Sequence, residues 1–428
     1  MSVERSVVVT GIGAITPSGL TAPSMWASVR AGRSGITLLP PELEGSGPVQ
    51  VGGVVGGFAA PADLPTSLAR HLTPMQQWAI TAADEAMDDA GAGDLPWNAD
   101  AAQVLVATGS GPVDAVTEAA GTLRETGRRR VPPSLAVYGT ADAVAGILSR
   151  RYGFLGQTHA ITAACASGAI AIGEGLRRIR HGYADAVLVV GMDDCLGPLH
   201  LAAHANLRSV VTGFGDDLSS ASRPFDRARS GFVMAQGAAA VLLEAADLAS
   251  ERGARPLATV AGFGATSDAH HATAPDPVAA GATRAINACL ADARATASAV
   301  DHVNTHGTGT VLGDAAELIA LEQALGARAP SVPLTATKST TGHLLGAAGV
   351  VETVIAAMTL RDQVLPPTIN LTDPDAEGWD FVRDQERRHP VRTVLSTSFG
   401  FGGHNAALLL TLPEVNCARA APFASPPR

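Results

Sequence analysis

The chain has 428 residues and a formal net charge of -10, with 46% hydrophobic, 16% charged and 4% aromatic residues. This length and hydrophobic content predict a well-buried globular core, spread over two or three domains or over one large duplicated unit. The acidic balance excludes general nucleic-acid binding, because affinity for phosphates requires a basic face. No stretch reaches about 18 uninterrupted apolar residues and no cleavable signal pattern precedes the first apolar run, so we expect a cytoplasmic protein without a membrane span.

The predicted elements alternate between strands and helices along the chain. Short apolar, β-branched runs predict strands over residues 7–13, 102–108, 186–191, 238–244, 257–264, 302–305 and 393–397. Longer amphipathic or Ala/Gly-rich stretches predict helices over residues 75–90, 169–180, 278–293, 315–325 and 344–360. Such alternation predicts α/β layering, with helices packed against mostly buried sheets.

Two pairs of segments indicate an internal duplication. The strand and glycine turn at residues 7–13 recur at 257–264, and the small-residue segment at 162–168 recurs at 338–343, each time before a helix. We place the seam within residues 249–255. This gives an N-terminal half over 1–252 and a C-terminal half over 253–414, and the proline-containing residues 415–428 are expected to be a disordered tail.

The four cysteines have irregular spacing and form no CxxC pair. This excludes a disulfide framework or a zinc ribbon and fits a reducing compartment. Cys165 lies in a loop of alanine, serine and glycine before a helix, whose N-terminus favours the thiolate and so makes the sulfur a better nucleophile. The alternative is a packing cysteine in the core, which is how we interpret Cys195, Cys289 and Cys417.

Two histidines and the only lysine of the chain lie at other junctions between elements. His306 follows a short apolar run, and His343 begins the helix over 344–360, shortly after Lys338. All other Lys/Arg positions are arginine, and a lysine is a compact charge that fits a tight buried pocket. Either histidine alone could be a hydrogen-bonded core residue. With Cys165 they form a set of polar groups at turns, where α/β folds assemble active sites.

The segment 398–405, Ser-Phe-Gly-Phe-Gly-Gly-His-Asn, is rich in glycine. Its backbone N–H groups could approach an oxyanion closely. A dinucleotide-binding loop is excluded, because a strand follows this segment in place of an acid-tipped βαβ unit.

Five ordered motifs point to a known family. They are residues 163–168, 222–226 with 231–233, 306–310, 338–343 and 398–405. Through them the chain resembles a β-ketoacyl-acyl-carrier-protein synthase of the type II class, in the thiolase superfamily, from Val7 to about Leu412. The resemblance implies an α/β thiolase fold, in which duplicated βαβαβαββ halves form a five-layered αβαβα architecture.

The resemblance also implies an acyltransferase reaction. Cys165 would take an acyl group from a carrier thioester, while His306 and His343 would hold a malonyl thioester and promote its decarboxylation. The resulting enolate would attack the acyl-cysteine and give a 3-oxoacyl product. The backbone N–H groups of Cys165 and Phe401 would form the oxyanion hole, and Phe401 would gate the pocket.

Further residues are placed by the same resemblance. Lys338 would form a buried ion pair with Glu352 that engages all its ammonium protons, in one polar cluster with the supporting residues Asp314 and Glu317. The substrate-binding residues would be Phe232, Thr308, Thr310, Phe399 and the chain-length position Pro112. Docking of the acidic acyl carrier protein would use Arg129, Arg130 and Arg208.

No metal and no redox cofactor are implied, because the substrates arrive on the phosphopantetheine arm of an acyl carrier protein. We expect a dimer, either a homodimer or a heterodimer with a ketosynthase-like chain-length factor. A non-catalytic chain-length-factor subunit would lack Cys165, a thiolase would carry a second cysteine within 398–405, and an initiating synthase would have asparagine in place of His343.

The chain departs from the family pattern at three positions. Ser230 and Gln236 stand where acidic residues are common, and Val311 stands where proline is common. Residues 209–220 are also longer and more acidic than their usual equivalent. The Met-Ala-Gln-Gly-Ala-Ala run starting at Met234 is nearer to the ketosynthases of type II polyketide systems, so we favour polyketide or specialised fatty-acyl biosynthesis. Housekeeping fatty-acid elongation stays as the alternative, and chain length, starter preference and carrier identity stay open.

Overall fold

The computed structural model describes residues 4–43, 47–92, 97–214 and 217–413. The predicted disordered tail at 415–428 lies outside them, as does Cys417. The main sheet has ten strands. They are β1 (Val7–Ile15), β4 (Ala102–Ala107), β5 (Thr158–Ile161), β6 (Ala186–Asp193), β7 (Gly237–Ala245), β8 (Ala258–Ser267), β9 (His302–Asn304), β10 (Leu334–Thr335), β13 (Thr393–Gly400) and β14 (His404–Thr411).

The strand order repeats between the two halves of the sheet. One half runs β5-β4-β6-β7-β1 and the other β10-β9-β13-β14-β8, joined by a short antiparallel pairing of β1 with β8. In both halves the first two pairings are parallel and the next two antiparallel. This repeat is the duplicated topology that the sequence predicts.

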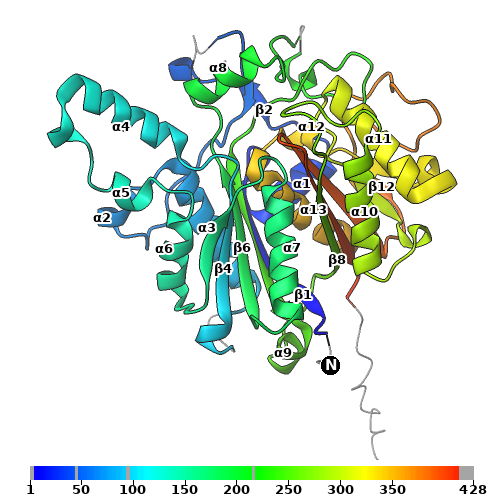
Figure 1. Cartoon of the computed structure of the whole chain (residues 1–428), viewed down its shortest axis with the longest axis horizontal. Helices are drawn as coiled ribbons and strands as arrows, with labels where there is room; N and C mark the ends of the chain where they lie inside the picture. The colour runs from blue at the N-terminus through cyan, green and yellow to red at the C-terminus, as the bar shows by residue number, and fades with distance from the viewer. Residues whose placement is uncertain (1–3, 44–46, 93–96, 215–216, 414–428) are drawn as a thin grey trace, which may run out of the picture.

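Helices form three layers around the sheet halves. The principal ones are α3 (Pro74–Asp89), α6 (Ala143–Tyr152), α7 (Ser167–Arg180), α10 (Ala280–Asp292), α11 (Val311–Leu325) and α13 (Ala348–Asp362). The first half packs against α3 through β1, β6 and β7, and the second packs against α10 through β8 and β14. Between the halves, α7 and α13 contact each other (Figure 1). The result is the predicted αβαβα layering.

Small residues bring the N-terminal ends of α7 and α13 together. A Cβ atom on Gly168 would lie 2.8 Å from the backbone nitrogen of Val350, and one on Gly349 would lie 2.3 Å from that of Ala169. Only glycine permits this approach. The turns that precede the two helices therefore lie next to each other, and these turns carry Cys165 and His343.

The predicted helix over 344–360 is wrong at its start. Residues Leu345–Ala347 form a short 3-10 turn, η7, and α13 begins at Ala348. Leu345 has a φ of 46°, which an α-helix excludes. Every residue of α13 from Ala348 to Leu360 is buried, so the helix lacks the polar face from which sequence periodicity is normally recognised.

One arm of the fold was not predicted. Helix α4 (Val113–Thr126) projects from the body (Figure 1), followed by η3 (Arg128–Arg130) and α5 (Leu135–Tyr138). The other helices are α1 (Ala22–Arg30), α2 (Thr66–Ala69), α8 (Pro198–Asn206), α9 (Ala246–Glu251) and α12 (Lys338–Thr341). Two small sheets pair β2 (Ile36–Leu38) with β3 (Val51–Gly53) and β11 (Val364–Leu365) with β12 (Arg387–Arg388). Because α9 occupies the first part of the predicted seam, the boundary at residue 252 stays a prediction.

Candidate active site

A cavity of about 350 Å³ opens beside Cys165, His306 and His343. Both halves of the duplicated fold contribute to it, Cys165 from the first and the two histidines from the second. Several other predicted site residues line the same cavity: Phe232, Thr308, Thr310, Phe399, Phe401 and Arg208. The structure therefore brings together most of the residues that the sequence singles out.

Cys165 sits on a strained turn between β5 and α7. Ala164 has a φ of 49°, in the region that non-glycine residues rarely adopt. The hydroxyl of Ser167 stabilises the turn, because its Oγ accepts from the N–H of Ala163 at 2.7 Å and donates to the carbonyl of Ala164 at 2.6 Å. The cysteine is 7% exposed and faces the cavity.

Burial and nearby charge have opposite effects on the Cys165 thiol. Burial raises its pKa to about 12, while the Lys338 ammonium and the backbone N–H groups of Phe401 and Cys165 lower it. With a pKa of about 12 the resting thiol is protonated at neutral pH, whereas the sequence argument from the helix N-terminus favours the thiolate. The two N–H groups that act on the sulfur are the pair predicted to form the oxyanion hole.

The glycine-rich hairpin between β13 and β14 lies directly against the Cys165 turn. A Cβ atom on Gly400 would lie 2.9 Å from the carbonyl oxygen of Ala163 and 3.0 Å from the nitrogen of Cys165. Gly402 and Gly403 turn the chain with φ values of 85° and 74°. Glycine is needed at 400 for the backbone of the hairpin to come this close to the cysteine.

The two histidine rings meet edge to face, with centroids 5.3 Å apart and planes at 85°. Burial lowers the pKa of His306 and of His343 well below 6.5, and the charge of Lys338 lowers both further. Both imidazoles are therefore neutral at neutral pH, with one N–H donor each. Nδ1 of His306 and both ring nitrogens of His343 are buried without a hydrogen-bond partner among the described residues. Such atoms are rare in folded proteins unless a ligand or water uses them.

Buried carboxylates at the start of α11 hold the turn that carries His306. The two oxygens of Glu317 accept from the backbone N–H groups of His306 and Gly307, both at 2.8 Å. Asp314 accepts from the N–H of Gly309 at 3.1 Å. Burial raises the pKa of Asp314 to about 7 and also raises that of Glu317. These contacts fix the backbone of the turn.

His343 is held by strand-like backbone pairing. Its N–H donates to the carbonyl of Val233 at 2.8 Å, and its carbonyl accepts from Ala235 at 3.0 Å. The ring of Phe232 contacts the imidazole edge to face, with centroids 5.2 Å apart. The segment around Phe232 therefore shapes the cavity and positions the histidine.

Lys338 lies behind the cavity and forms an ion pair with Glu352. Both side chains are 3% exposed. Burial raises the pKa of Glu352 to about 7, and the Lys338 charge opposes that rise. Among the described residues Glu352 is the one hydrogen-bond acceptor of the ammonium group, so engagement of all three protons stays a prediction. The lysine lowers the pKa of Cys165 and of both histidines.

Three predicted residues lie away from the Cys165 cavity. Pro112 occupies the position before the first residue of α4 and lines a separate cavity of about 450 Å³. Arg129 and Arg130 are exposed on η3, beyond the projecting α4, whereas Arg208 lines the Cys165 cavity. The chain-length role of Pro112 and the docking role of the arginines stay predictions.

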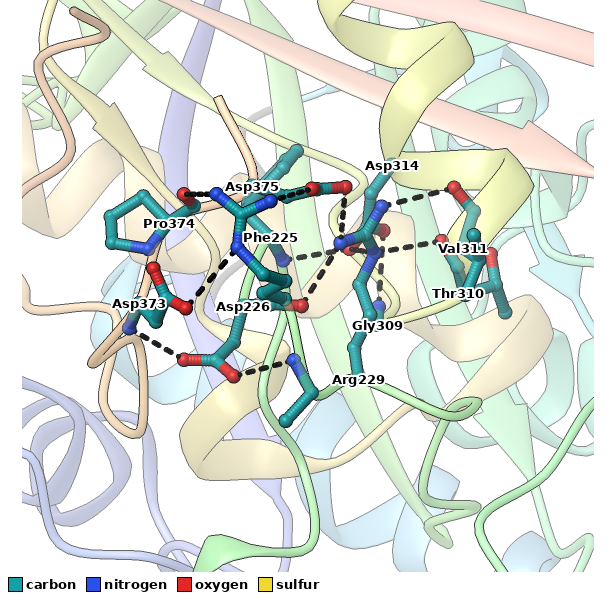
Figure 2. Close-up of polar contacts among 12 residues, drawn as sticks. Phe225, Asp226, Arg229, Gly309, Thr310, Val311, Asp314, Asp373, Pro374 and Asp375 are labelled. Carbon is teal, nitrogen blue, oxygen red and sulfur yellow. Dashed lines mark hydrogen bonds and ion pairs between the residues drawn. The ribbon is translucent and has the colours of Figure 1, made fainter. Parts of the chain in front are cut away.

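Four further residues that support the site were not predicted. Asp193, at the carboxyl end of β6, accepts from the N–H of Gly346 at 2.6 Å, and burial raises its pKa to about 6. Thr397 donates to Glu317 at 2.6 Å, and His204 stacks on Phe401 with centroids 6.4 Å apart. Arg229 binds the turn after His306 (Figure 2). The position of Asp193 at a strand end was the one signal that could have revealed it.

Comparison with known families identifies this constellation. The family model described as "Beta-ketoacyl synthase, N-terminal domain" matches residues 4–249, and the one described as "Beta-ketoacyl synthase, C-terminal domain" matches residues 257–372. The chain belongs to the β-ketoacyl synthase family. The resemblance stated from the sequence motifs is thereby confirmed, as is the class of condensing acyltransferases.

Curated members of the family align along nearly the whole chain. The 3-oxoacyl-[acyl-carrier-protein] synthase 2 of Synechocystis sp. is 37% identical over 95% of this chain and 97% of its own length. The protein of the same name from Coxiella burnetii is 36% identical over 95% of this chain and 99% of its own.

Solved structures of the family share the fold. A β-ketoacyl synthase from Burkholderia phymatum is 32% identical with a TM-score of 0.87, covering 96% of this chain and 100% of that one. A type II polyketide ketosynthase, solved with its acyl-carrier protein and described as bound to the hexaketide, is 28% identical with a TM-score of 0.89 at the same coverage. The predicted thiolase fold is confirmed.

Two features are absent from the part of the chain that the structure describes. No helix in this part of the chain is both long and apolar enough to cross a membrane. No group of three or more His, Cys, Asp or Glu side chains within it could hold a metal ion.

Proposed function

We propose that this member of the family is a 3-oxoacyl-[acyl-carrier-protein] synthase that extends an acyl chain in two half-reactions. The observation that carries the proposal is the shared cavity, in which the Cys165 thiol, two backbone N–H groups and two neutral imidazoles converge. Such a set supplies a nucleophile and separate donors for two thioester carbonyls.

The first half-reaction is acyl transfer to Cys165. The sulfur attacks the carbonyl carbon of a carrier-bound acyl thioester, and the negative charge on oxygen is stabilised by the N–H groups of Cys165 and Phe401. Collapse of this intermediate breaks the bond to the carrier sulfur. The proton of the cysteine thiol ends on the carrier thiol, which leaves.

The second half-reaction is decarboxylative condensation. His306 and His343 donate N–H hydrogen bonds to the thioester oxygen of a malonyl group while its carboxylate leaves as CO₂. The enolate carbon attacks the acyl carbonyl on Cys165, the carbon–sulfur bond breaks, and the released thiolate takes a proton from water. Neutral imidazoles suit this role, because each keeps one N–H donor and can be buried without the cost of desolvating a charge.

The surrounding residues serve binding and positioning in this proposal. Thr308 and Thr310 contact the pantetheine arm, Phe232 and Phe399 line the malonyl side, and Phe401 gates the acyl pocket. Lys338 acts through its ion pair with Glu352, as a fixed positive charge behind the site. No resident cofactor is assigned, since the carrier supplies the pantetheine.

We assign the partners by chemistry. The carrier is an acidic acyl carrier protein that docks on arginines, among them Arg208 at the cavity and Arg129 and Arg130 on the projecting arm. The working assembly is a dimer, with a second copy or with a ketosynthase-like chain-length factor. The cell compartment is the cytoplasm.

The pathway that we favour is type II polyketide or specialised fatty-acyl biosynthesis. Similarity to a ketosynthase described with a bound hexaketide supports this assignment. Housekeeping fatty-acid elongation is the second candidate, which the names of the curated relatives support. Competition between saturated acyl carriers and 3-oxoacyl carriers for Cys165 distinguishes the two.

The test is reconstitution with acyl- and malonyl-carrier protein. Intact mass should show the acyl adduct on Cys165 and then a 3-oxoacyl carrier longer by one two-carbon unit. A folded wild-type protein that acquires no adduct would contradict the proposal and would favour a non-catalytic, chain-length-factor-like role.

A further inference from the structure

Arg229 is a buried arginine whose guanidinium lies beside the active-site turn without lining the cavity. Its side chain is 3% exposed. The Nε–H donates to the carbonyl of Thr310 at 3.4 Å, and an Nη2–H donates to that of Val311 at 3.1 Å. A third hydrogen bond, at 2.9 Å, goes from Nη1 to the carbonyl of Asp226 in its own segment. The guanidinium therefore joins two chain segments through their backbones.

Two carboxylates complete the surroundings of the guanidinium (Figure 2). Asp314, which is 1% exposed, lies 3.4 Å from Nε, and Asp375, which is 40% exposed, lies 2.9 Å from Nη1. Asp314 also accepts from the N–H groups of Gly309 and Phe225. The Arg229–Asp314 pair therefore binds both the turn after His306 and the segment that contains Phe225.

The two segments joined by Arg229 both reach the cavity. On one side the turn at Thr308–Val311 lines it, and on the other Ser230 and Phe232 do. The N–H of Gly231 donates to the carbonyl of Gly309 at 3.0 Å, so the backbones also pair directly. Since arginine presents several donors in a fixed planar fork, it can satisfy three carbonyls and two carboxylates at once, which a lysine cannot.

We infer that Arg229 is a positioning residue for the pantetheine arm, holding the Thr308–Val311 turn in the conformation that binds it. This rests on the proposed function, because the arm belongs to the carrier-bound substrates. Arg229 touches no reacting atom. Its loss should weaken every step that uses the carrier and leave the intrinsic reactivity of Cys165 unchanged.

The test compares two reagents on the same cysteine. A carrier-bound acyl thioester reaches Cys165 through its pantetheine arm, whereas iodoacetamide is small and carries no such arm. For Arg229→Lys we expect acylation by the carrier, measured as kcat/KM, to fall about 10- to 100-fold, mainly through KM, because small displacements of a positioning element cost this much. The iodoacetamide rate should stay within about twofold, since the Cys165 turn is untouched.

Arg227→Ala is the matched control. Arg227 lies in the same segment and pairs with Asp373 and Asp375, but its side chain is 55% exposed and it makes no contact with the turn. It should leave both rates unchanged. Asp375→Asn removes one outer partner of Arg229 from a half-exposed position and should give a smaller loss, again confined to the carrier reaction.

Equal losses with both reagents, or no loss with the carrier, would overturn the inference. If Arg229→Lys does not fold, Asp375→Asn decides: a carrier-specific loss beyond that of Arg227→Ala supports the positioning role, and equality of the two contradicts it. Failure of the wild-type protein to acylate would instead contradict the proposed function itself.

Discussion

The two turns that meet in the active site occupy equivalent places in the duplicated fold yet are built differently. In the first half, β5 leads through a strained turn of small residues to Cys165 and α7. In the second half, β10 leads through α12 and η7 to α13, and this longer connection carries Lys338 and His343. One turn is short and presents a thiol to the cavity, while the other contains a buried charge and a histidine.

This difference shows that the two halves share a topology but carry different functional side chains. The common topology places both turns at the carboxyl ends of parallel strands, where their side chains meet. Close packing at Gly168 and Gly349 keeps the helix ends in contact. The two halves differ in their chemistry. The first supplies the nucleophile, and the second supplies the histidine donors and the fixed charge that act on the malonyl thioester.

The largest expected effect comes from Gly400→Ala, which forces the glycine-rich hairpin between β13 and β14 away from the Cys165 turn. The new Cβ would lie 2.9 Å from the Ala163 carbonyl and 3.0 Å from the Cys165 nitrogen, so the hairpin must move and the Phe401 N–H leaves the oxyanion position. We expect acylation of Cys165 to fall about 100- to 1,000-fold, as for loss of one oxyanion-hole donor.

The control for this change is Gly121→Ala in α4, where an added Cβ meets nothing within 4 Å. It should acylate like wild type. Acylation of Gly400→Ala at the wild-type rate would show that the hairpin does not set the oxyanion hole.

Lys338→Arg tests the connection in the second half, which contains the buried charge. Charge is retained, but the larger guanidinium must fit where both partners of the ion pair are 3% exposed. We expect the free energy of unfolding, measured with denaturant, to fall by about 1–3 kcal/mol through overpacking. Condensation should fall at least about tenfold, because the charge behind the histidines is displaced.

The reverse exchange on the surface, Arg177→Lys, serves as the control, since this side chain is 49% exposed on α7. It should change neither stability nor turnover. Near-wild-type condensation by Lys338→Arg would mean that any buried cation suffices and that the compact ammonium has no special role.

The pH dependence tests the neutral state of the histidines. Because burial lowers the pKa of both well below 6.5, neither imidazole should gain a proton between pH 8 and 6, as followed by NMR of the histidine rings. The rings are followed directly because burial raises the pKa of Asp314 and of Glu352 to about 7, so these carboxyls titrate in the same range. Protonation of His306 or His343 near pH 6.5 would contradict the neutral state.

The same neutral state has a consequence for stability. In the unfolded chain the histidines have a pKa of about 6.5. Below that pH the unfolded chain binds protons that the folded protein does not, so the free energy of unfolding falls as the pH falls. The stability difference between wild type and His343→Gln, measured by denaturant unfolding, should therefore shrink from about pH 7 to about pH 5. A difference that grows on acidification would contradict this.

The smallest effect is expected at the rim of the cavity. Arg208→Ala should raise the KM for malonyl carrier about two- to fivefold at low salt and have no effect at high salt, because exposed charges act mainly on encounter and are screened. Arg294→Ala, at a side chain 82% exposed and paired with Glu4, is the control and should behave like wild type. A salt-independent loss at Arg208 would indicate a packing role.

Much of the fold was predictable because most strands of the main sheet are short apolar runs bounded by glycine or polar residues. The half-buried β5 and the two-residue β10 lack this signal and were not predicted. The αβαβα architecture and the catalytic set came from the resemblance carried by the motifs. The arm at α4 was not predicted, although Val113, Val116, Ala119 and Leu123 follow a helical spacing. In the fold Ala119 is its one buried residue, while Val116 and Leu123 are 46% and 50% exposed. Arg229 and Asp193 escaped notice because they bind backbone atoms distant in sequence, such as the N–H of Gly346, and backbone partners leave no mark in the side-chain pattern.

The most direct test of the division between the halves is decarboxylation of malonyl carrier by Cys165→Ala. We predict that this variant forms no acyl adduct yet still converts malonyl carrier to acetyl carrier and CO₂, as followed by intact mass, because His306, His343 and Lys338 are unchanged. Loss of decarboxylation together with acylation, in a folded variant, would contradict the claim that the nucleophile of the first half and the histidine donors of the second half act in separate half-reactions.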